Sequence, residues 1–63
     1  MSDMLIREKK IDQKIYAVWE HRSPVRFYEV TVQNLEKSSL LNVVLHTYSK
    51  QKAIRKYIEL IGG

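Results

Sequence analysis

The feature that most constrains this chain is an amphipathic stretch over residues 49–62. On a helix of about 3.6 residues per turn, its apolar side chains share one face: Ala53, Ile54, Tyr57, Ile58, Leu60 and Ile61. Ser49 stands where an N-cap belongs, because its hydroxyl can accept a hydrogen bond from the first turn. Gly62 suits the left-handed position that ends many helices. The stretch therefore predicts a C-terminal helix that buries one face against the rest of the chain.

Three segments before that helix are rich in β-branched and aromatic residues and predict β-strands. They are Lys14–His21, Arg26–Gln33 and Leu40–Tyr48. A turn at Ser23–Pro24 is expected to join the first two strands, and a polar loop over Asn34–Ser39 the last two. The sequence thus predicts an α+β fold, a three-stranded antiparallel β-meander with one C-terminal α-helix packed on one face.

Residues 13–63 are expected to form this single domain. Residues 1–12 carry mixed charges around a short apolar run, Met4 to Ile6, and are expected to form a charged N-terminal arm. The arm either stays flexible, as chain ends often do, or uses its apolar run to extend or cover the sheet.

A four-residue loop over residues 22–25 would set the register of the first two strands. It would pair His21 with Arg26, so that Ala17 faces Val30 on one side of the sheet. The residues then predicted to face the helix are Ile15, Ala17, Trp19, Tyr28, Val30, Val32, Leu41, Val43 and Leu45. A slip of one residue would turn a strand's whole apolar set to the other side.

The opposite face of the predicted sheet is more apolar than expected for a surface exposed to water. Its predicted partner-binding residues are Tyr16, Val18, Phe27 and Val44. Contiguous exposed apolar surface usually marks a contact site, and aromatic residues are favoured anchors there. The partner would be another protein or a second copy of the chain. Alternatively, the N-terminal apolar run covers this face, or these are scattered surface hydrophobics.

The charge balance points to a different class of partner. The chain has 11 basic and 7 acidic residues, a net charge of +4, which favours polyanions. The residues that would contact nucleic-acid phosphates are Arg7, Lys9, Lys10, Arg22, Arg26, Lys50, Lys52, Arg55 and Lys56. Lys50 and Lys52 lie in the first turn of the predicted helix, where acids are favoured. They either help to bind an anion there or simply extend into water.

No pattern in the sequence predicts catalysis. There is no glycine-rich phosphate loop, metalloprotease motif or nucleophile elbow, and the absence of cysteine excludes disulfides and thiolate metal sites. A chain of 63 residues also buries too little surface to enclose an active site readily. We therefore expect a non-enzymatic protein with no cofactor, no metal and no small-molecule substrate.

The sequence also gives an expectation for the compartment. No apolar run approaches the length of a membrane-spanning helix, and Asp3 and Glu8 interrupt residues 1–10 in a way that a signal peptide does not tolerate. We expect a cytoplasmic protein without a membrane partner.

Two functions remain. The first is a small protein-binding module, an inhibitor, adaptor or accessory factor of the kind that phage and other mobile-element genomes often encode. It would act through the partly apolar sheet face or as a homodimer. The second is a small basic protein that binds nucleic acid through the helix and the arm. Glu20 and Glu29 would repel phosphate on the sheet face, so the first function is favoured.

The predicted order of elements is similar to that of the arm-type DNA-binding domains of phage and transposon integrases. That resemblance covers element order alone and would imply that the sheet reads DNA.

Overall fold

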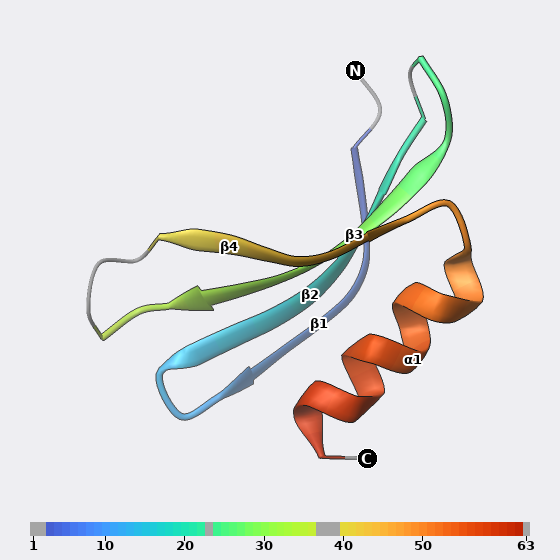
Figure 1. The fold of residues 1–63 in the computed structure, drawn as a ribbon. Coiled ribbons are helices and arrows are strands. Elements are labelled where there is room, and N and C mark those ends of the chain that lie inside the picture. Colours follow the sequence, from blue (N-terminus) through green and yellow to red (C-terminus); the bar gives the residue numbers. More distant parts are fainter. Residues whose placement is uncertain (1–2, 23, 37–39, 63) are drawn as a thin grey trace.

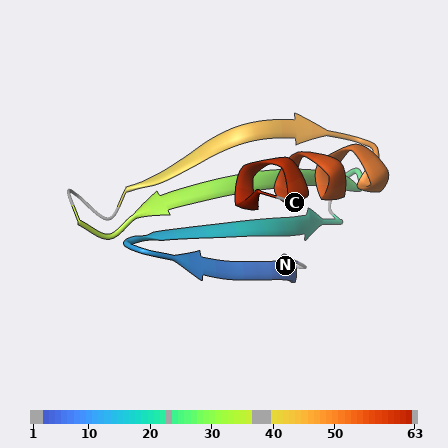
Figure 2. The same ribbon diagram turned by 90° about the horizontal axis from the view of Figure 1, so that it is seen from below.

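The computed structural model describes residues 3–22, 24–36 and 40–62. In these residues the chain forms four strands and a helix: β1 (Met4–Ile11), β2 (Lys14–His21), β3 (Phe27–Asn34), β4 (Leu41–Thr47) and α1 (Lys50–Ile61). The strands make one antiparallel sheet in the order β1-β2-β3-β4. The helix lies against one face of this sheet (Figures 1 and 2).

The predicted three-stranded sheet is wrong, because residues Met4–Ile11 form a fourth strand. This strand pairs along β2, with Leu5 opposite Trp19 and Ile11 opposite Lys14. Its charged residues suggested a solvated arm, yet an edge strand tolerates charge because one side of it faces water. The fourth strand also changes the element order on which the resemblance to integrase domains rested.

A two-residue turn at Asp12 and Gln13 makes this extra strand feasible. Asp12 has a φ of 57°, in the left-handed region that Asp tolerates better than most residues. The carbonyl of Gln13 accepts a hydrogen bond from the backbone N–H of Leu35 at 2.7 Å. The turn is therefore tied to the chain that leaves β3.

The predicted register between the first two strands of the sequence is also wrong. His21 pairs with Phe27, so the connection spans residues 22–26 and is one residue longer than expected. Val18 therefore meets Val30, and β2 turns Tyr16 and Val18 toward the helix instead of Ala17 and Trp19. Residues 23 and 37–39, which belong to the predicted turn and polar loop, lie outside the described residues.

A bulge in β4 changes which residues of that strand face the helix. Val43 pairs with Thr31 and Leu45 pairs with Val30, which leaves Val44 without a partner between them. Leu45 consequently faces the helix as predicted and packs against the core. Leu41 and Val43 face away from it, because the extra residue inverts the alternation on one side of the bulge.

The predicted helix is confirmed, together with both of its caps. The Ser49 hydroxyl accepts a hydrogen bond from the backbone N–H of Lys52 at 3.3 Å. Gly62 has a φ of 89° and its N–H donates to the carbonyl of Glu59 at 3.3 Å. Ala53 and Tyr57 are buried, whereas Ile58, which was expected to face inward, is 43% exposed.

The core lies between α1 and the middle strands. Its fully buried members are Val18, Tyr28, Val30, Ala53 and Tyr57, with Ile6, Tyr16, Leu45, Ile54, Leu60 and Ile61 packed around them. The helix contacts β2, β3 and β4. Within the described residues, no helix has both the length and the apolarity needed to cross a membrane.

Candidate functional site

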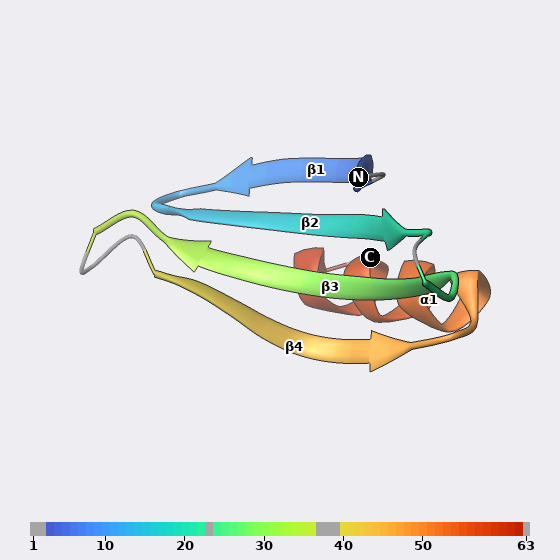
Figure 3. The ribbon, with the colours of Figure 1, turned by 90° about the horizontal axis from the view of Figure 1, so that it is seen from above.

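The face of the sheet that points away from α1 is called the open face here. By register it carries Leu5, Glu8, Lys10, Ile15, Ala17, Trp19, His21, Phe27, Glu29, Thr31, Gln33, Leu41, Val43 and His46. No described element covers it, and Figure 3 looks onto it with the helix behind the sheet. The open face is thus available for contact.

The centre of the open face is built on Trp19. Its indole Nε1–H donates to the Thr31 hydroxyl on the neighbouring strand at 3.0 Å. Thr31 is only 1% exposed, and Ala17 beside it is also buried. The only tryptophan of the chain is therefore tied to the neighbouring strand by a specific hydrogen bond.

A row of rings crosses one end of the open face. His21 stacks on Phe27 with centroids 4.6 Å apart, and Phe27 lies 4.7 Å from His46 on the other side. Tyr48 meets His46 edge-on at 5.7 Å. These separations fall in the range where aromatic pairs add to area burial, so the row links β2, β3 and β4 on this face.

His21 also holds two carboxylates. Its Nδ1 lies 2.8 Å from Asp3 Oδ1, and its Nε2 lies 2.8 Å from Glu29 Oε1. The contact with Glu29 is not an aligned hydrogen bond, since Nε2 has no partner with hydrogen-bond geometry. The contact of Nδ1 with Asp3 is a hydrogen bond, and it ties Asp3 to the sheet.

Between these groups the open face is hollowed. A cavity of about 210 Å³ is lined by Asp3, Trp19, His21, Glu29, Thr31 and Leu41. It combines an indole, an aliphatic side chain and two carboxylates. The cavity is partly open to solvent.

The apolar side chains that remain exposed concentrate on β4. Leu41 is 54% exposed, Val43 51% and Val44 41%. Leu40, which precedes the strand, is also exposed, and at the opposite edge Leu5 is 42% exposed. The β4 side of the open face is accordingly its most apolar part.

The predicted partner-binding residues are split between the two faces. Val18 is 0% exposed and Tyr16 packs against the core, so both lie on the helix side. Phe27 is half-buried on the open face, and Val44 lies exposed in the bulge. Tyr16 and Val18 were predicted to lie on the face away from the helix because the predicted register of β2 and β3 was wrong.

Five residues of the open face were predicted to face the helix: Ile15, Ala17 and Trp19 because of the register error, and Leu41 and Val43 because of the bulge. Their β-propensity was visible in the sequence. The face of the sheet on which they lie could not be predicted, because it depends on the length of one loop and on one bulge.

The basic residues predicted to contact phosphate are spread over separate surfaces. Arg7 and Lys9 lie on the helix side of β1 and Lys10 lies on the open face. Arg22 and Arg26 each approach the buried carboxylate of Glu20 at 3.5 Å. The two arginines therefore interact with a carboxylate of this protein and are not available only to an external phosphate.

The remaining basic residues lie on α1. Lys50, Lys52 and Arg55 are exposed, and Lys56 Nζ lies 3.2 Å from Glu59 Oε1. A hollow of about 330 Å³ between the helix and β4 is lined by Leu45, Lys52, Arg55, Lys56 and Glu59. This is the one place where several of the predicted phosphate contacts converge among the described residues.

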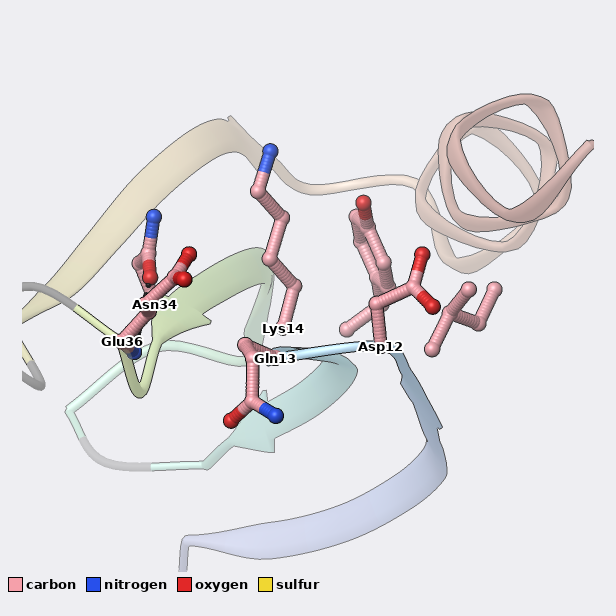
Figure 4. A pocket seen from close by; sticks show the side chains of 7 residues that line it. Asp12, Gln13, Lys14, Asn34 and Glu36 are labelled. Carbon is pink, nitrogen blue, oxygen red and sulfur yellow. Dashed lines mark hydrogen bonds between the residues drawn. The ribbon is translucent and has the colours of Figure 1, made fainter.

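A third hollow, of about 350 Å³, lies beside the turn between β1 and β2 (Figure 4). It is lined by Ile11, Asp12, Gln13, Lys14, Tyr16, Asn34 and Glu36. Its shape depends partly on Asn34, whose side-chain oxygen accepts a hydrogen bond from the N–H of Glu36 at 2.9 Å.

In the part of the chain that the structure describes, no three His, Cys, Asp or Glu side chains are grouped to hold a metal ion.

Comparison with protein-family models, curated proteins and solved structures found no match to this chain.

Proposed function

We propose that this chain is a small non-enzymatic protein-binding module, an inhibitor, adaptor or accessory factor whose contact surface is the open face. The observation that carries the proposal is the exposed apolar row Leu41, Val43 and Val44, on a sheet whose other face is already covered by α1. Contiguous apolar surface of this kind usually marks a contact between macromolecules.

The composition of the open face supports a protein as the partner. Aromatic side chains with a polar tip are favoured at protein interfaces because they bury large areas yet still make hydrogen bonds. Trp19 and Phe27 are already fixed in place on this face, so little entropy remains to be lost when a partner covers them. Burial of one exposed leucine or valine contributes about 1.5–3 kcal/mol at most.

The proposal is tested with Phe27→Asp, which places a charge in the ring row at one end of the open face, between His21 and His46. Ile58→Asp is the control, because Ile58 is an exposed apolar residue that belongs to α1. Tagged wild type and the Ile58 variant should retain the same protein from a lysate of the source cells. The Phe27 variant should lose it. Tyr48→Asp, at a residue 70% exposed at the end of the ring row, repeats the test without touching the core.

Circular dichroism and Trp19 fluorescence verify that each variant is folded. Retention of the same protein by wild type, Phe27→Asp and Tyr48→Asp alike would overturn the open face as the contact surface.

A second candidate function is binding of nucleic-acid phosphates by α1. It is supported by the hollow beside β4, where Lys52, Arg55 and Lys56 converge. Glu59 neutralises part of this charge through Lys56, which leaves Lys52 and Arg55 as the cations that could meet phosphate. This surface is separate from the open face, so the two functions can be tested independently.

A further inference from the structure

The two edges of the sheet differ in charge. β1 carries Arg7, Glu8, Lys9 and Lys10, whereas β4 has the sequence LNVVLHT and no charged residue. Both edges present backbone N–H and C=O groups that none of the described strands pairs. Charged side chains keep an edge from pairing with other chains, and an apolar uncharged edge invites an added strand. The β4 edge is thus the one suited to pairing.

We infer that a second copy of this chain pairs with β4, antiparallel and β4 against β4, so that two four-stranded sheets join into one. The inference goes beyond the proposed function, because it concerns the edge of β4 and leaves the open face uncovered. The twofold axis of such a pair is perpendicular to the sheet. Both open faces then lie on the same side of the joined sheet.

Charge supports self-pairing at this edge. Each copy carries a net charge of +4, yet pairing β4 with β4 brings no like charges side by side within the strand. Pairing β1 with β1 would bring together two strands that each carry Arg7, Lys9 and Lys10 against the single acid Glu8, and like charges opposite one another are destabilising. The β4 edge is therefore the more favourable of the two for a second copy.

The bulge of β4 is compatible with this pairing in a symmetric register. Asn42 and Leu45 belong to the helix side, while Leu41 and His46 belong to the open face. A twofold axis between Val43 and Val44 places Asn42 opposite Leu45 of the second copy. It also places Leu41 opposite His46, so residues in each pair share a face. Bulges often discourage edge pairing, but here the facing pattern remains symmetric about the axis.

Packing of two open faces against each other is disfavoured by comparison. The carboxylates of Asp3 and Glu29 flank His21 on that face. A face-to-face dimer would bury these carboxylates, and removing a charge from water is unfavourable. Edge pairing leaves them in water and keeps the open faces free for another protein.

The test is the oligomeric state in solution, measured by light scattering and sedimentation over a range of concentrations. Wild type should form a dimer. Val43→Lys and Val43→Glu should each be monomeric, because two like charges meet beside the axis. An equimolar mixture of the two variants should restore a mixed dimer. Leu5→Lys is the matched control, since Leu5 is an exposed apolar residue of the same face at the other edge, and it should remain dimeric.

A wild type that stays monomeric at the highest concentration would overturn the inference, as would a dimer that Val43→Lys leaves intact. Loss of the dimer in Leu5→Lys would indicate face-to-face packing and also overturn it, and so would a mixture that stays monomeric. A monomeric wild type that still retains another protein through Phe27 leaves the proposed function standing. A dimer that retains no other protein supports the edge pairing and removes the binding of a different partner.

Discussion

Glu20 illustrates how much a single residue of this small protein depends on its neighbours. Its carboxylate is almost fully buried at the helix side of β2. The Tyr28 hydroxyl donates to it at 3.2 Å, and Arg22 and Arg26 approach at 3.5 Å from largely exposed positions. Ion pairs with exposed arginines are weak. The buried hydroxyl is therefore the more important partner.

Tyr28→Phe should lower the free energy of unfolding by about 1–3 kcal/mol, because it removes a donor from a buried carboxylate and leaves the ring in place. Urea unfolding followed by Trp19 fluorescence measures this change. Tyr48→Phe, at an exposed ring, should leave the stability unchanged. Equal stabilities for the two variants would show that the arginines and water suffice for Glu20.

For the helix and strands, the features that depend on neighbouring residues were predicted well, and the features that depend on distant residues were not. The limits of α1 follow from Ser49 and Gly62, whose effects act within one turn. The limits of β2 were also predicted correctly from its run of β-formers.

The pairing between elements was not predicted, because it depends on features that the local sequence does not specify. One additional loop residue before Phe27 changed which side of β2 faces the helix. The bulge at Val44 has no signal in a run of apolar residues. β1 was not recognised because its edge position allows charges that usually indicate a solvated segment.

The N-cap gives a prediction at this scale. Ser49→Ala should destabilise the protein by about 1 kcal/mol, because the N–H of Lys52 loses its acceptor. Ser49→Asp should be as stable as wild type or more stable, since a carboxylate both caps the helix and meets the positive end of its dipole. Thermal unfolding followed by circular dichroism compares the three proteins. A Ser49→Ala variant as stable as wild type would contradict the cap's contribution.

Across the whole molecule, charge is segregated. The open face carries the acids Glu8 and Glu29 with a single described lysine, Lys10, whereas the outer side of α1 carries Lys50, Lys52 and Arg55. A protein partner on the open face and a phosphate chain on the helix would therefore approach from opposite sides. The net charge alone did not indicate this separation.

If α1 binds nucleic acid, its affinity for duplex DNA should fall with salt by about 0.9 log units per log unit of salt for each phosphate neutralised. Arg55→Glu should weaken binding and make this slope shallower, while Lys10→Glu on the open face should change both much less. Gel shifts at two salt concentrations measure the slopes. No binding by the wild type at low salt would remove this candidate function.

The edge position of β1 has a consequence for how the protein comes apart. Within the described residues, β1 has a neighbouring strand on one side only, and α1 packs over β2, β3 and β4. If β1 detached, the protein would lose the contacts of Ile6 and the backbone hydrogen bonds between β1 and β2. The pairing of Val18 with Val30 would remain intact. The N-terminal strand would detach as a separate step, ahead of cooperative melting of the remainder.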